Sequence, residues 1–128
     1  MTVALALFSA LLHVYIFVME SILWGTPRVN KSFGVKTEDA LVMKPFAFNQ
    51  GFYNLFLSIA IIVGLFLIHS QGKQQGIYLV DYAMLSIFGA GIVLFSSNSS
   101  LWFPATMQAL PPFIYCIFRI IQLSRGVA

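Results

Sequence analysis

The chain has very few charged residues and a single cysteine. Only 9% of its 128 residues are Asp, Glu, Lys or Arg, whereas a soluble domain carries about 25%. The seven basic residues are scattered among the expected loops and helix ends, so the net charge of +3 does not indicate a nucleic-acid-binding surface. Cys116 stands alone, which excludes an internal disulfide and a cysteine-based metal cluster. The composition therefore indicates an integral membrane protein, whose main partner is the lipid bilayer.

The two histidines are too few and too far apart to predict a metal or haem site. His13 lies within the first apolar segment, and His69 lies at the far end of the second. A zinc site takes three or four protein ligands, and a haem held by two histidines needs both at a similar depth. The G-x-S-x-G motif of serine hydrolases is also missing. We therefore expect no metal and no other cofactor.

Apolar sequence is what the chain has in abundance, since 59% of its residues are hydrophobic. Four apolar segments have about the length that a transmembrane helix needs, and they cover residues 2–24, 46–69, 77–95 and 103–123. The sequence predicts an all-α fold, an integral membrane four-helix bundle formed by one domain over residues 1–128. Asp81 is expected at the membrane edge of the third span. The proline pair at 111–112 frees backbone carbonyls and predicts a kink in the fourth span.

Residues 25–45 form the only sizeable loop, and part of it has the pattern of a short helix. Thr37 is a good N-cap, acidic residues follow it in the first turn, and Lys44 stands in the last turn. This pattern predicts a short interfacial helix over residues 38–44, although an ordinary polar linker would explain the composition equally well. The loop also holds four of the seven Lys and Arg residues. The positive-inside rule therefore places the loop in the cytoplasm and both termini outside.

Several polar residues lie inside the expected spans, and the topology brings them to one half of the membrane. Glu20 lies near the end of the first span, and His13 lies one heptad earlier on the same helical face. The second span opens with NQGFYN at residues 49–54, and Gln108 lies near the start of the fourth. An ionisable group within a span is costly, so it faces the bundle interior and finds partners. We expect the partners of Glu20 to be the amides of Asn49, Gln50, Asn54 and Gln108.

Three motifs along the chain carry a resemblance to a known family. They are the stripe His13, Glu20 and Trp24, the NQGFYN box at residues 49–54, and QALP at residues 108–111. Together they resemble the bacterial domain-of-unknown-function family 1304, whose members are small four-span membrane proteins. The resemblance covers nearly the whole chain. It implies a four-helix fold and a multi-pass location in the bacterial cytoplasmic (inner) membrane, and it implies no activity.

Three functions remain open at this point. The first is a binder or carrier of a small amphiphilic molecule, proton-linked through Glu20; a carrier would act as a homodimer, because four short helices enclose little volume. The second is an intramembrane isomerase or hydratase in which His13 and Glu20 exchange protons on a lipid-like substrate. The third is a structural or accessory subunit whose polar face docks a membrane span of a partner protein, so that the second and fourth helices expose their amides toward lipid in the isolated chain. Trp24 would then be an anchor at the membrane interface. The candidate ligand-binding residues are Trp24, Asn49, Gln50, Tyr53, Asn54 and Gln108.

Overall fold

The computed structural model describes residues 2–126, which fold into helices joined by short turns. The elements are α1 (Thr2–Phe17), the π-helix η1 (Val18–Ile22), α2 (Pro27–Phe33), α3 (Thr37–Ile68), α4 (Lys73–Ser97), the 3-10 turn η2 (Ser99–Leu101) and α5 (Trp102–Ser124). Four helical stretches are long and apolar enough to cross a membrane, namely Thr2–Ile22, Thr37–Ile68, Lys73–Ser97 and Ser99–Ser124. The predicted all-α bundle of four membrane-spanning helices is therefore confirmed.

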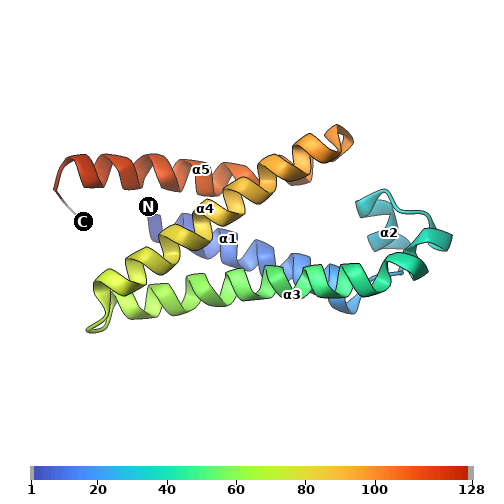
Figure 1. The fold of residues 1–128 in the computed structure, drawn as a ribbon, viewed down its shortest axis with the longest axis horizontal. Helices are drawn as coiled ribbons and strands as arrows, with labels where there is room; N and C mark the ends of the chain where they lie inside the picture. Colours follow the sequence, from blue (N-terminus) through green and yellow to red (C-terminus); the bar gives the residue numbers. More distant parts are fainter. Residues whose placement is uncertain (1, 127–128) are drawn as a thin grey trace.

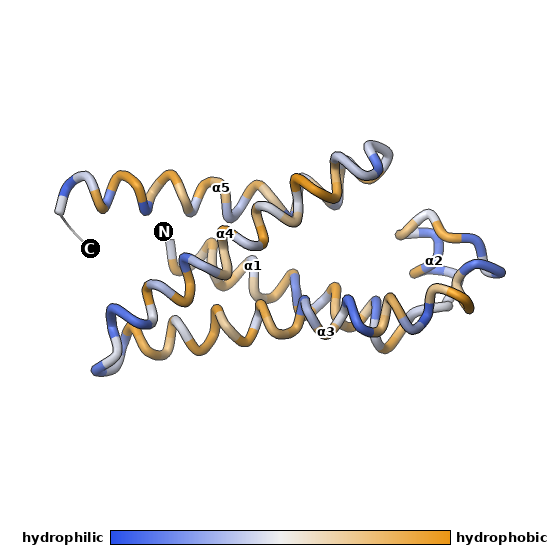
Figure 2. The backbone as a smooth tube through the Cα atoms, viewed as in Figure 1, coloured by the Kyte–Doolittle hydropathy of each residue, from blue (hydrophilic) through white to orange (hydrophobic). Residues whose placement is uncertain are grey.

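The four long helices pack in a ring in the order α1, α3, α4, α5. α3 and α4 form one antiparallel hairpin, α4 and α5 form the next, and α1 lies against both α3 and α5 (Figure 1). α1 and α4 make few direct contacts, because they face each other across the ring. Apolar residues dominate the long helices, whereas hydrophilic residues gather at α2 and at the turn between α3 and α4 (Figure 2). This distribution is the one expected of a bundle whose long helices lie in lipid.

A seam of mostly small residues holds α3 against its neighbours. The buried positions of α3 repeat at alternating spacings of four and three, which places them on one helical face; they include Ala47, Gly51, Asn54, Ser58, Ile61 and Leu65. Small residues let helix backbones approach closely in a membrane. A close backbone approach joins α3 to α4, where a Cβ added to Gly76 would lie 2.5 Å from the Gly64 carbonyl oxygen.

α3 is longer than the second span expected from the sequence. The short helix expected over residues 38–44 is the first part of α3, which continues through Pro45 to Ile68, and Lys36 is its N-cap in place of Thr37. With 32 residues and a rise of 1.5 Å per residue, the helix is about 48 Å long. A hydrocarbon core is about 30 Å thick, so α3 is longer than one perpendicular crossing needs. Its charged residues, Glu38, Asp39 and Lys44, all lie in its first turns. α5 likewise remains helical across Pro111 and Pro112.

Candidate functional site

Glu20 lies in the short π-helix that ends the first span. This π-helix, η1, directly follows the regular α1, and π-turns inside α-helices are rare and are frequent at functional sites. Glu20 is 9% exposed, and its carboxylate points into the seam between the first span and α3. Gly51 permits the close approach, because a Cβ there would collide with the Ser21 hydroxyl and lie 3.1 Å from Glu20 Cβ. The π-turn and the glycine together set Glu20 against α3.

The carboxylate of Glu20 has one hydrogen-bond donor among the described residues. Asn54 Nδ2 lies 2.8 Å from Glu20 Oε2, and the same amide lies 3.1 Å from the Gln50 backbone carbonyl oxygen. The adjacent Ser21 hydroxyl donates to the Phe48 carbonyl at 2.9 Å, which fastens η1 to α3. The ion pair that the structure contains within residues 2–126 involves other residues. Glu20 is therefore held by an amide, without a cationic side chain.

The other predicted partners of Glu20 lie elsewhere. Asn49 and Gln50 are exposed on the outer face of α3, and so is the candidate ligand-binding residue Tyr53, which is 55% exposed. Gln108 is half-buried, and no hydrogen bond joins its side chain to Glu20 in the described part of the chain. The structure thus brings Asn54 to Glu20 and leaves the remaining amides apart. A ligand-binding role for them stays a prediction.

His13 is fully buried, one turn after Ser9 in the middle of α1. Its Nδ1 lies 2.8 Å from the Ser9 backbone oxygen, whereas Nε2 has no hydrogen-bond partner among the described residues. His13 and Glu20 are seven residues apart in sequence, or about 10 Å along the helix axis. The two side chains are therefore too far apart to exchange a proton directly.

Trp24 fastens the segment after the first span to both α2 and α3. Its indole Nε1 donates to the Ala40 carbonyl at 2.8 Å, and its ring meets Phe33 edge to face at a centroid distance of 5.4 Å. Ala40 lies in the first turn of α3, and Phe33 ends α2. These contacts give Trp24 a structural role in holding α2, and its ligand-binding role stays a prediction.

Two recesses open on the surface of the bundle, away from Glu20. One of about 330 Å³ is lined by Gly34, Val35, Asp39, Val42 and Met43, and one of about 300 Å³ is lined by Gly91, Ile92, Phe95, Ala105, Thr106 and Ala109. No candidate ligand-binding residue lines either recess. Within residues 2–126, no three His, Cys, Asp or Glu side chains come together to hold a metal ion.

Asp81 joins α4 to α5, a pairing that sequence reasoning missed. Its carboxylate accepts from Arg119 Nε at 2.9 Å and from Arg119 Nη2 at 3.0 Å, and the Tyr115 hydroxyl donates to it at 2.5 Å. Gln122 accepts from the remaining Arg119 nitrogen, Nη1, at 3.0 Å. Because α4 starts at the end of the bundle where α5 finishes, topology alone brings residues 81 and 119 to a similar depth. That is the signal that could have predicted this ion pair.

Comparison with known proteins gives one family. A family model described as protein of unknown function (DUF1304) matches residues 7–120, a range that reaches into all four spans and includes Glu20 and Asn54. No curated protein and no solved structure matches the chain. The family match agrees with the resemblance found in the sequence motifs.

Proposed function

The chain belongs to the DUF1304 family of proteins of unknown function, and we propose that it binds a small amphiphilic cation within the membrane. Glu20 is the counter-ion of this ligand. The observation that carries the proposal is the contrast between the two carboxylates inside the spans. Asp81 already has Arg119 as a partner, whereas Glu20 has only the amide of Asn54 among the described residues.

Burying a charge without a partner is costly, and a buried carboxylate is ordinarily paired or else takes up a proton. A cationic ligand would supply the charge that the protein does not place beside Glu20. When the ligand displaces a proton from the carboxylate, binding becomes linked to proton release. This linkage is the physical basis for the proton-linked binding expected from the sequence.

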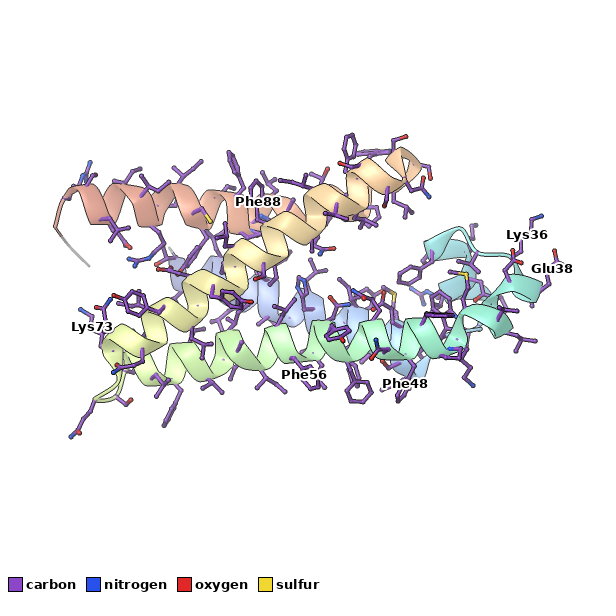
Figure 3. All side chains as sticks on the ribbon, in the orientation of Figure 1. Lys36, Glu38, Phe48, Phe56, Lys73 and Phe88 are labelled. Atoms are coloured by element: carbon purple, nitrogen blue, oxygen red, sulfur yellow. The ribbon has the colours of Figure 1, made fainter. Side chains whose placement is uncertain are left out.

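Aromatic side chains next to the Glu20 seam suit the apolar part of such a ligand. Phe17 meets Phe52 edge to face at a centroid distance of 5.2 Å, and Phe52 lies between Phe48 at 5.0 Å and Phe56 at 6.2 Å. Phe48 and Phe56 point away from the bundle along the outer face of α3 (Figure 3). Phenyl rings bind both apolar groups and cations, the latter through the ring quadrupole. An amphiphile arriving from the lipid would meet these rings before it met Glu20.

The enzyme alternative receives less support. It needs His13 and Glu20 to exchange protons, and the two side chains share no hydrogen bond in the described chain. Simple binding needs only the carboxylate and the rings beside it. If the protein also carries its ligand across the membrane, we expect it to do so as a homodimer, because one copy of four helices encloses little volume.

The proposal is tested by binding of tetraphenylphosphonium, a lipophilic cation, to purified protein in detergent, with a pH-indicator dye in a weakly buffered solution. We expect the wild type to bind the cation and release protons, and Glu20→Gln to lose both signals. Glu38→Gln is the matched control, since Glu38 is exposed at the start of α3 and should leave both unchanged. Equal binding by the wild type and Glu20→Gln would refute the role of Glu20 as counter-ion.

A further inference from the structure

The middle of α1 contains two polar side-chain atoms that are buried and lack a partner within residues 2–126. They are Ser9 Oγ and His13 Nε2, on residues that are 1% and 0% exposed. Residues four apart lie on the same face of a helix, so both atoms belong to one part of the core. Buried polar atoms in native proteins nearly always have a hydrogen-bond partner, either in the protein or in an ordered water molecule.

The hydrogen bond of His13 fixes which ring nitrogen carries the proton in the neutral imidazole. Nδ1 lies 2.8 Å from the backbone oxygen of Ser9. A carbonyl oxygen only accepts hydrogen bonds, so Nδ1 must be the donor and must carry the hydrogen. Nε2 of the neutral ring is then a lone-pair acceptor. His13 Nε2 therefore needs a hydrogen-bond donor.

α5 contributes a second acceptor near the same level. Pro112 is fully buried within α5, and proline has no backbone N–H. The carbonyl of Gln108, four residues earlier, is therefore without its usual helical donor. In a membrane such a carbonyl must be satisfied by a neighbouring helix, a side chain or water.

The packing of α1 against α5 gives the approximate level of this carbonyl relative to His13. α1 and α5 lie side by side and run in opposite directions (Figure 1). Ala10 of α1 and Tyr115 of α5 belong to the same core cluster. In an antiparallel pair, the residues after Ala10 lie opposite those before Tyr115, so His13 lies near the level of Pro112, and the Gln108 carbonyl points along α5 toward the Pro112 nitrogen.

We propose that one ordered water molecule is bound between α1 and α5 at this level. It donates one hydrogen to His13 Nε2 and the other to the Gln108 carbonyl, and it accepts the hydrogen of the Ser9 hydroxyl. Two acceptors and one donor match a single water, and about three hydrogen bonds is the usual number for a buried water molecule. The water explains why a polar pair occupies the centre of an otherwise apolar helix. The inference is independent of ligand binding at Glu20.

The test is solid-state NMR of the protein in lipid bilayers with isotope-labelled histidine. The chain has two histidines, so the reference protein is His69→Gln, in which every histidine signal comes from His13. We expect an unprotonated Nε2 and transfer of water magnetisation to the His13 ring. A protonated Nε2, or the absence of transfer to this buried ring, would overturn the proposal.

Two prolines that are adjacent in α5 supply a matched pair of variants. Pro112→Ala restores an N–H for the Gln108 carbonyl and should abolish or strongly reduce the water transfer. Pro111→Ala restores the donor of a different carbonyl, that of Met107, and should leave the transfer intact. Ser9→Ala removes the third partner without altering α5 and should also reduce the transfer. If Ser9→Ala and Pro112→Ala both retain the full signal, the water is not bound between these groups.

Discussion

Arg119 binds Asp81 with two nitrogen atoms, Nε at 2.9 Å from Oδ1 and Nη2 at 3.0 Å from Oδ2. This bidentate geometry is the strongest arrangement of a carboxylate–guanidinium contact. The pair fastens the start of α4 to the end of α5. Glu20 lies at the opposite end of the bundle, where α1 meets the first half of α3. The bundle is thus fastened by an ion pair at one end and by an amide–carboxylate contact at the other.

Asp81→Asn is predicted to destabilise the protein, because it leaves the charge of Arg119 without a counter-charge. We expect a loss of about 1–3 kcal/mol in the free energy of unfolding in detergent, less than the ~3–5 kcal/mol for a fully buried pair, because the Asp81 side chain is 32% exposed. Asp39→Asn is the control, since Asp39 is exposed on the first turn of α3. If both variants have the same free energy of unfolding as the wild type, the ion pair does not contribute to the stability of the bundle.

Gly76→Ala is predicted to disturb the hairpin of α3 and α4. The new Cβ would lie 2.5 Å from the Gly64 carbonyl oxygen and 2.7 Å from the Ile68 nitrogen, and overpacking of this kind costs about 1–3 kcal/mol. Gly89→Ala, in the same helix, meets no atom within 4 Å and should instead gain about 0.5–1 kcal/mol from helix propensity. Thermal unfolding is followed by circular dichroism. We expect Gly76→Ala to lower the midpoint temperature and Gly89→Ala to raise it. If Gly76→Ala and Gly89→Ala unfolded at the same temperature, α3 and α4 would not pack as closely at Gly76 as the structure shows.

Much of this fold follows from the sequence, because a long apolar segment in a membrane has almost no alternative to a helix. The four spans were predicted for that reason. The extent of α3 was harder to predict, since Pro45 is a usual sign of a helix boundary and the structure continues the helix through it. The π-turn at Val18–Ile22 has no signature in composition or periodicity that would distinguish it from a regular helical end.

The environment of Glu20 was predictable only in part. The NQGFYN box contains several amides, and helical spacing alone does not say which face of α3 is buried. The signal lay in the small residues, because Gly51 and Ser58 continue the four–three spacing through Asn54 and mark the packed face. Read in that way, the sequence selects Asn54 as the partner of Glu20 and places Asn49 and Tyr53 outside.

Trp24→Phe is predicted to loosen α2 without unfolding the bundle. The variant keeps an aromatic ring against Phe33 and loses the indole donor to the Ala40 carbonyl, a bond whose net contribution is about 0.5–1.5 kcal/mol. Hydrogen exchange of residues 25–36 should therefore accelerate by up to about tenfold, while exchange in the long helices stays the same. Trp102→Phe is the control, because Trp102 is 59% exposed. Unchanged exchange in Trp24→Phe would mean that other contacts hold α2.

Asn54→Ala is predicted to destabilise the protein more than alanine substitution of the exposed amides of the NQGFYN box. It removes the one donor that the described structure gives to the Glu20 carboxylate, and a buried polar group left unsatisfied costs about 1–3 kcal/mol. Asn49→Ala changes an exposed amide on the same helix and should stay within about 0.5 kcal/mol of the wild type. Both are measured as free energies of unfolding in detergent.

A double-mutant cycle separates the contact from the general effect of losing an amide. In a Glu20→Ala background the partner of Asn54 is already gone, so Asn54→Ala should cost less there than in the wild type. For residues in direct contact we expect a coupling free energy of about 0.5–3 kcal/mol. Additive costs, or an Asn49→Ala variant as unstable as Asn54→Ala, would show that the box stabilises the bundle as a whole. Coupling confined to Asn54 would instead show that the Glu20–Asn54 contact itself stabilises the packing of the first span against α3.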